Sequence, residues 1–211
     1  MLLRREAEVY VRNLASAIEL PADGIVLDFG CGYGHVTSLL SDRVREMYFW
    51  DAAVNIRTDA AANLSRVKKA FCWHPGDATT RFDLILVNSV VQCMTPNELS
   101  AWLVRWRRIL SERGRIILSD IVFPGHSLIG DMWSLFRFSV SRGYIVEAVR
   151  MALAERKRYA ATAQVRELFR PTREELAALA QQANLCLEFL PRNLSHFRAR
   201  HAAILTLNGS V

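Results

Sequence analysis

The sequence predicts an α/β fold: a single domain with a mostly parallel sheet and helices on both of its faces. Short apolar runs alternate with segments whose apolar side chains recur at helical spacing, which is the pattern of strand–helix–strand units. Several of the apolar runs end in an acidic residue, at the sheet edge where parallel strands hold ligands. A length of 211 residues suffices for one buried core, so we expect one domain over residues 1–211.

The first part of the chain predicts a helix, a strand and a glycine-rich loop. Residues 4–20 form an amphipathic pattern that Pro21 interrupts, and residues 25–27 form a buried strand. Asp28 and three glycines at alternate positions follow, and apolar residues at helical spacing come next. The free N–H groups at the start of that helix would point over the strand end, so a ligand can bind there.

The remaining elements are predicted in order along the chain. Strands are expected at 46–51, 70–74, 82–87, 115–120, 186–190 and 202–207, and helices at 55–67, 95–110 and from Thr172 onward. Thr95 with Glu98 and Thr172 with Glu175 have capping-box spacing, and Gly114 is expected to end the helix before the fifth strand. Trp102 and Trp106 recur with leucines at helical spacing, which favours core packing over a nucleic-acid surface. A hairpin at the end makes the last strand antiparallel.

Residues 123–170 interrupt the strand–helix rhythm and predict a helical lid. An insertion after the carboxyl end of a strand in such a sheet lies over the ligand crevice. The segment has eight basic and four acidic residues. This excess favours an anionic acceptor, although a general bias toward arginine explains it equally well, since the chain has only three lysines.

The spacing of the glycines in the loop limits the class of ligand that it can bind. A dinucleotide fingerprint needs a third glycine where His35 stands, and a phosphate loop needs Gly-Lys-Ser/Thr, which is absent. The remaining pattern, Asp28-x-Gly30-x-Gly32-x-Gly34, resembles motif I of the class I S-adenosylmethionine-dependent methyltransferases. The resemblance implies a Rossmann-like seven-stranded sheet of order 3-2-1-4-5-7-6, and it implies S-adenosyl-L-methionine as the cofactor.

The resemblance also implies cofactor-binding positions. The methionine half would lie against Asp28, Gly30, Cys31, Gly32 and Gly34. Asp51, 21 positions after Gly30 and followed by Ala52, has the spacing of an acid that binds ribose hydroxyls. Asp77 and Ala78 correspond to the segment that holds adenine, although a turn-forming aspartate is an alternative for Asp77. Asn88 and Ser89 would line the gap between cofactor and acceptor.

Acceptor-side residues are predicted from position. Gln92 follows the fourth strand, and Trp133, Arg137 and Tyr144 lie in the lid segment. A general base helps if the acceptor arrives protonated, and His196, His126 and Asp120 lie where the family's pocket opens. The segment after the fourth strand is not Asn-Pro-Pro-Tyr, which disfavours methylation of nucleobase amines.

Composition limits the location and the partners. The sequence contains no stretch of 18 apolar residues without a charged residue, and it has no secretory signal. We therefore expect a cytoplasmic protein. Four scattered cysteines indicate neither disulfides nor a metal site. We expect O- or N-methylation of a small molecule, and no nucleic-acid partner. An RNA or protein acceptor and a non-catalytic cofactor-binding module are the alternatives.

Overall fold

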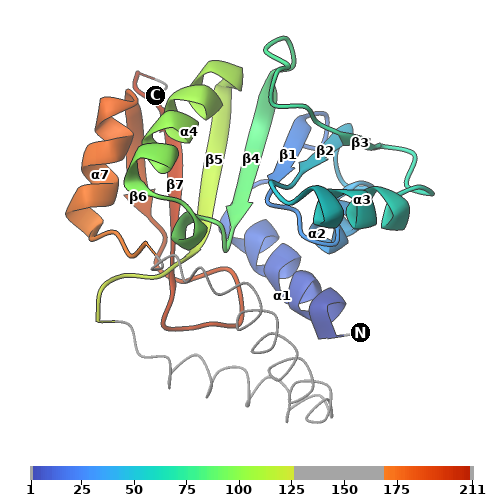
Figure 1. Ribbon diagram of the computed structural model, residues 1–211, viewed down its shortest axis with the longest axis horizontal. Coiled ribbons are helices and arrows are strands. Elements are labelled where there is room, and N and C mark those ends of the chain that lie inside the picture. Colours follow the sequence, from blue (N-terminus) through green and yellow to red (C-terminus); the bar gives the residue numbers. More distant parts are fainter. Residues whose placement is uncertain (1, 126–168, 210–211) are drawn as a thin grey trace.

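A computed structural model describes residues 2–125 and 169–209. Its single sheet has the order β3-β2-β1-β4-β5-β7-β6 (Figure 1), in which β7 alone runs antiparallel to all the other strands. The strands are β1 (Ile25–Phe29), β2 (Glu46–Trp50), β3 (Ala70–Cys72), β4 (Phe82–Asn88), β5 (Leu110–Ile121), β6 (Leu185–Phe189) and β7 (His201–Leu207). The helices are α1 (Leu2–Ala17), α2 (His35–Leu40), α3 (Val54–Asn63), a short 3-10 turn η1 (Val91–Cys93), α4 (Pro96–Ile109) and α7 (Arg173–Gln182). The predicted strand order and the reversed last strand are confirmed.

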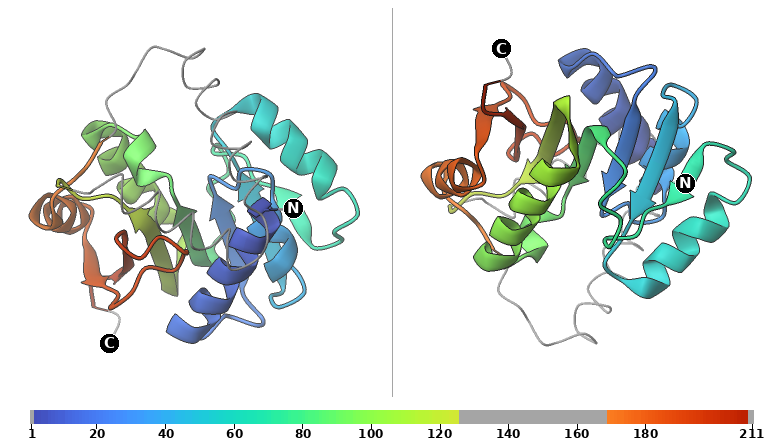
Figure 2. Two further views of the ribbon diagram at one scale, coloured as in Figure 1. Left: turned by 90° about the horizontal axis from the view of Figure 1, so that it is seen from below. Right: turned by 90° about the horizontal axis from the view of Figure 1, so that it is seen from above.

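Helices pack on both faces of the sheet, as predicted. Side chains of α1 and α2 bury one face, where Leu14 and Leu40 meet Met47. Side chains of α4 and α7 bury the other, where Leu103 and Leu176 meet the apolar side chains of β4 and β5. Figure 2 shows α1 and α4 on opposite sides of the sheet. The helix α3 packs through Ala60 and Leu64 against Phe49 of β2.

An aromatic cluster forms part of the core beneath α4. Phe29 of β1 lies with its ring centroid 4.5 Å from that of Trp102 and 4.9 Å from that of Trp106. Trp106 is fully buried, and the Trp50 ring lies 5.4 Å from Trp102. The two tryptophans of α4 therefore pack in the core, which confirms their predicted role.

The predicted start of the fifth strand is wrong. The helix α4 ends at Ile109, and β5 begins at Leu110 and runs through Gly114, which had been expected to end the helix. Leu110 pairs with Phe82, and the register then shifts before Leu84 pairs with Arg115. A Cβ at Gly114 would lie 2.7 Å from the Phe82 carbonyl oxygen, so this glycine lets the two strands approach at the irregularity.

The capping boxes are present as predicted. The Thr95 hydroxyl accepts from the Glu98 N–H while the Glu98 carboxylate accepts from the Thr95 N–H, and Thr172 and Glu175 repeat the pattern at α7. In the described residues, no helix is long and apolar enough to cross a membrane. Of the predicted lid at 123–170, residues 126–168 lie outside the described part of the chain.

Candidate functional site

The glycine loop after β1 is fixed from below by a buried carboxyl group. Asp28 is 3% exposed and accepts a 2.7 Å hydrogen bond from the Thr37 hydroxyl on α2. Burial raises the pKa of Asp28 to about 6, against the hydrogen bonds from Thr37. The N–H groups of Gly30 and Cys31 both donate to the Trp50 carbonyl at the end of β2. Asp28 therefore supports the loop from the core side.

The three glycines of the loop face different surroundings, although all have positive φ. A Cβ on Gly30 would collide with the Val90 side chain, and one on Gly34 would lie 2.8 Å from Cδ1 of Leu64. A Cβ on Gly32 would meet no atom within 4 Å. Gly30 and Gly34 are thus needed for packing within the protein, whereas Gly32 leaves its backbone accessible to a ligand.

Asp51, just after β2, lies beside the open glycine. One carboxylate oxygen accepts from the Gly32 N–H at 3.1 Å, and the other accepts from the Ala53 N–H at 3.0 Å. Asp51 is half-buried and Ala52 is exposed. Each carboxylate oxygen can accept more than one hydrogen bond, so Asp51 can also accept from a ligand hydroxyl. The structure therefore brings the predicted ribose-binding residue next to Gly32.

Asp77 follows β3 and uses its carboxylate within its own turn. Its oxygens accept hydrogen bonds from the hydroxyls of Thr79 and Thr80 and from the backbone N–H of Thr79, at 2.6–2.8 Å. These hydrogen bonds lower the pKa of Asp77. The side chain shapes the 77–80 turn, and Ala78 lies exposed within it. The Asp77 carboxylate thus bonds within its own turn, as expected of a turn-forming aspartate.

The ends of β4 and β5 are joined by polar side chains. The Ser119 hydroxyl lies 3.0 Å from Oδ1 of Asn88 and 3.3 Å from the hydroxyl of Tyr10, a buried residue of α1. The Ser89 hydroxyl donates to Asp120 at 2.7 Å. Ser89 and Asp120 both have a φ of 58°, a left-handed backbone conformation that residues other than glycine rarely adopt.

Gln92 lies on η1, directly after this strained segment. Its amide nitrogen donates to the Ser89 carbonyl at 2.9 Å, while its Oε1 is buried and accepts no hydrogen bond from the described residues. A buried acceptor of this kind normally has a donor. Oε1 of Gln92 is thus an enclosed polar atom for which the described residues supply no donor.

Asp120 is the centre of a buried network. It is 2% exposed, and one carboxylate oxygen accepts from the side chains of Asn193 and Ser195 in the loop between β6 and β7. The other oxygen accepts from Ser89 and lies 3.7 Å from Nη1 of Arg200. The network ties the end of β5 to the β6–β7 loop.

Glu6, on α1, joins this network and was missed by the sequence analysis. Its Oε1 lies 3.8 Å from Nε2 of His196, whose ring packs against Phe197 at a centroid distance of 3.9 Å. Burial and the negative charge of Asp120 raise the pKa of Glu6 to about 7, although the Arg200 guanidinium opposes the shift. Figure 1 shows α1 and the β6–β7 loop at the sheet end where β4 ends.

The sequence contained a signal for this contact. Glu6, Tyr10 and Asn13 recur at spacings of four and three, so they share one face of an otherwise amphipathic helix. Asn13 donates to the Leu194 carbonyl at 2.8 Å, so this polar face of α1 docks on the β6–β7 loop. Four predicted residues, His126, Trp133, Arg137 and Tyr144, lie outside the described part of the chain.

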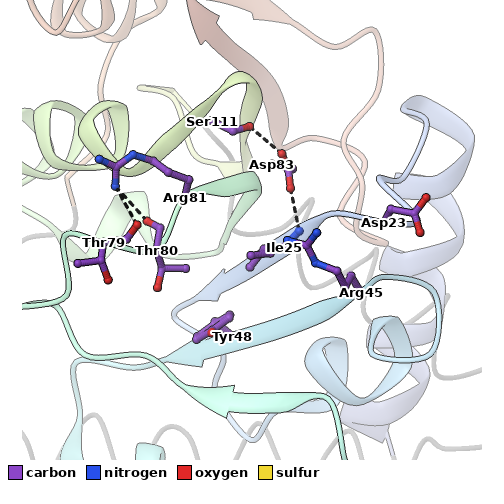
Figure 3. Close-up of a pocket in the computed structure, with 9 residues that line it drawn as sticks. All are labelled: Asp23, Ile25, Arg45, Tyr48, Thr79, Thr80, Arg81, Asp83 and Ser111. Carbon is purple, nitrogen blue, oxygen red and sulfur yellow. Dashed lines mark hydrogen bonds between the residues drawn. The ribbon is translucent and has the colours of Figure 1, made fainter.

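A hollow of about 620 Å³ lies at the opposite edge of the sheet from the glycine loop (Figure 3). Asp83 there accepts from the Ile25 N–H at 2.8 Å and from the Ser111 hydroxyl at 2.7 Å. Arg81 donates to the carbonyls of its own turn, including that of Ala78 at 2.6 Å. These polar groups are satisfied within the protein, and the hollow lies at the amino ends of the strands, away from the glycine loop.

A family model described as a methyltransferase domain matches residues 2–188. The chain belongs to this methyltransferase family. The match confirms the resemblance to class I S-adenosylmethionine-dependent methyltransferases on which the fold was predicted. No curated protein is significantly similar in sequence to this methyltransferase.

Solved structures share the fold of this methyltransferase at low identity. The mitomycin 7-O-methyltransferase MmcR has a TM-score of 0.66 and 13% identity, over 96% of this chain and 54% of that one. The magnesium protoporphyrin IX methyltransferase from Synechocystis PCC 6803, with bound S-adenosylhomocysteine, has a TM-score of 0.58 and 15% identity, over 96% and 81%. The O-methyltransferase NcsB1 of neocarzinostatin biosynthesis is in complex with S-adenosylhomocysteine and 1,4-dihydroxy-2-naphthoic acid. It has a TM-score of 0.62 and 16% identity, over 98% of this chain and 56% of that one. This methyltransferase thus spans about half the length of two of these three proteins.

Proposed function

We propose that this methyltransferase transfers a methyl group from S-adenosyl-L-methionine to the oxygen or nitrogen of a small molecule. The observation that carries the proposal is the position of Gly32. Of the three loop glycines, it alone has open space where a side chain would project, and the Asp51 carboxylate lies beside it. A loop that is packed on two sides and open on the third fits a ligand that contacts the backbone closely.

Different groups of described residues would bind the different parts of the cofactor. The loop formed by Gly30, Cys31, Gly32 and Gly34, with Asp28 beneath it, would hold the methionine half. Asp51 and Ala52 would hold the ribose, and the backbone of the 77–78 turn would hold the adenine. When bound, the cofactor supplies a methyl group on a positively charged sulfur. Asn88 and Ser89 would line the boundary with the acceptor, and the protein's contribution is mainly orientation and exclusion of water.

The acceptor would bind at the ends of β4 and β5. Gln92, which follows β4 on η1, would contact the acceptor there. The prediction that residues 123–170 form a lid carrying Trp133, Arg137 and Tyr144 belongs to this proposal. The 1,4-dihydroxy-2-naphthoic acid bound to NcsB1 favours an aromatic acceptor of similar size.

Binding of S-adenosylhomocysteine tests the cofactor half of the proposal. Isothermal titration should show binding by the wild type and a dissociation constant that is about 10–100-fold higher in Asp51→Asn. A hydrogen bond to a charged group contributes about 1.5–3 kcal/mol, which corresponds to that factor. Asp59→Asn, at an exposed acid on α3, is the matched control and should bind like the wild type. Absence of binding by the wild type, or equal affinity in Asp51→Asn, would contradict the proposal.

Release of S-adenosylhomocysteine tests the acceptor half. A panel of phenols, hydroxynaphthoic acids, and primary and secondary amines should contain molecules that accelerate this release. An RNA or protein acceptor is the second candidate, because basic residues outnumber acidic residues by eight to four in 123–170. It predicts retention on an RNA column that falls steeply with salt, and transfer to RNA instead of the panel. Binding without transfer to any acceptor would instead favour a non-catalytic module.

A further inference from the structure

Four charged or titratable side chains lie together at the ends of β4 and β5. They differ in the fraction of the side chain that is exposed and can contact a bound molecule. They come from three segments that are distant in sequence: Glu6 from α1, Asp120 from β5, and His196 and Arg200 from the β6–β7 loop. A general base has to come within hydrogen-bonding distance of the proton it takes. Exposure therefore separates the candidates for this role.

The two described candidates from the sequence are enclosed. The Asp120 side chain is 3% exposed, and its oxygens already accept hydrogen bonds from Ser89, Asn193 and Ser195. The His196 side chain is 6% exposed, and both of its ring nitrogens are buried. Neither group offers a free edge to an acceptor.

Glu6 is the partly exposed carboxyl group of the cluster. Its side chain is 24% exposed, and one of its oxygens faces His196 at 3.8 Å. Tyr10, one helical turn further along α1, is buried against Ser119, so this face of the helix lies on the strand ends. The carboxyl group is thus held at the border between the buried network and the surface.

The surroundings of Glu6 suit a group that exchanges a proton near neutral pH. Asp120 from β5 repels a negative charge on Glu6, Arg200 from the β6–β7 loop attracts one, and His196 from the same loop is in contact. Burial is the largest effect, and the resulting pKa is about 7. A base whose pKa lies near the working pH is the most effective.

We propose that Glu6 takes the proton from the acceptor during methyl transfer, with His196 and Asp120 as positioning residues. The inference rests on the proposed function and narrows the acceptor to molecules whose methylated atom carries a proton, such as a neutral hydroxyl or a protonated amine. The proton passes from the acceptor atom to a Glu6 oxygen, and the electron pair left on that atom forms the bond to the methyl carbon. The carbon–sulfur bond breaks and sulfur keeps its electron pair.

Two measurements on Glu6→Gln and Glu6→Asp test the role, with Glu8→Gln on the same helix as the matched control. In protein labelled with ¹³C at glutamate carboxyl carbons and saturated with S-adenosylhomocysteine, one signal missing from Glu6→Gln should titrate with a midpoint near 7. Transfer to the fastest panel acceptor should fall at least 100-fold in Glu6→Gln, which is the usual contribution of a general base. Glu6→Asp should keep a pH-dependent rate, and Glu8→Gln should match the wild type.

The pH profile separates a base from a structural side chain. The wild-type rate at saturating acceptor should rise with pH to a plateau above about 7, and the rate of Glu6→Gln should be independent of pH in this range. Binding of S-adenosylhomocysteine should be unchanged in Glu6→Gln. If the wild type itself does not bind S-adenosylhomocysteine, the proposed function is refuted, and not the role of Glu6. A carboxyl midpoint near 4.5, or a Glu6→Gln variant with the wild-type rate and pH profile, would overturn the inference.

Discussion

Replacing Gly32 and Gly34 with alanine separates ligand contact from packing in the glycine loop. Both residues have positive φ, 54° and 78°, and an alanine in this region costs about 1–2 kcal/mol. Part of that cost is offset by about 0.4–1 kcal/mol, because alanine restricts the unfolded chain more than glycine does. For Gly32 nothing else is added, since its Cβ would meet no protein atom within 4 Å. Gly32→Ala should therefore lose about 1 kcal/mol of unfolding free energy.

Gly34→Ala should be clearly less stable than Gly32→Ala. Its Cβ would lie 2.8 Å from Cδ1 and 3.0 Å from Cγ of Leu64, a residue that is 4% exposed and packs against α3 and β2. Forcing an extra methyl group into a packed core costs about 1–3 kcal/mol in addition to the strain. The total loss should be about 2–4 kcal/mol.

Urea unfolding followed by tryptophan fluorescence measures the two stabilities, and titration with S-adenosylhomocysteine measures binding. Gly32→Ala should bind at least tenfold more weakly than the wild type, because its methyl group fills the space assigned to the ligand. Folded Gly34→Ala should retain more of the affinity, since its methyl group points into the protein. Wild-type affinity in Gly32→Ala, or equal stability of the two variants, would refute this division of the loop.

Two further predictions concern single carboxyl groups. Because folding raises the pKa of Glu6 from 4.5 to about 7, its contribution to stability is fully present below about pH 4.5 and is lost as the pH rises through 7. Glu6→Gln, which resembles the protonated form, should match the wild type in urea unfolding at pH 4 and exceed it by about 2–3 kcal/mol at pH 8.5; a less stable variant at pH 8.5 would contradict this. Asp77→Asn should change the dissociation constant for S-adenosylhomocysteine less than threefold in calorimetry, since the carboxylate bonds only within its own turn. A loss as large as that in Asp51→Asn would show that the carboxylate binds the cofactor directly.

The parts of the fold that sequence predicts well are those with local causes. The strands β1 and β4 are mainly apolar and buried on both faces, and their predicted bounds agree with the structure within two residues. The start of α4 is predicted to the residue, because Thr95 and Glu98 form the capping box with each other. The loop from Asp28 to Gly34 is likewise a local pattern of one acid and three glycines.

The parts that sequence predicts poorly depend on distant partners. Residues 112–114 are polar and end in glycine, which is typical of a turn, yet they extend β5 because Leu110 pairs with Phe82 of β4. The network around Asp120 joins it to Ser195, 75 positions later, and no periodicity connects such residues. The helical spacing of Glu6 with Tyr10 and Asn13 marks a polar face of α1, but the groups that Glu6 faces, on β5 and the β6–β7 loop, are again distant in sequence. A local pattern can therefore predict the cofactor loop, whereas the acceptor side requires the tertiary structure.

The two ends of the strands differ in the number of features that lower the stability of the folded protein. This difference supports placing the functional site at the carboxyl ends. At the amino ends of the strands, Asp83 has two short hydrogen bonds. Among the described residues, Asn184 before β6 has a left-handed backbone there, which asparagine adopts at less cost than most residues. At the carboxyl ends, Ser89 and Asp120 hold left-handed backbone conformations, and burial raises the pKa values of Asp28 and Glu6. Each of these features lowers stability at neutral pH, by about 1–3 kcal/mol. Such costs collect where a site needs fixed geometry and groups that exchange protons, so the same features that destabilise this edge argue that it holds the cofactor and the acceptor.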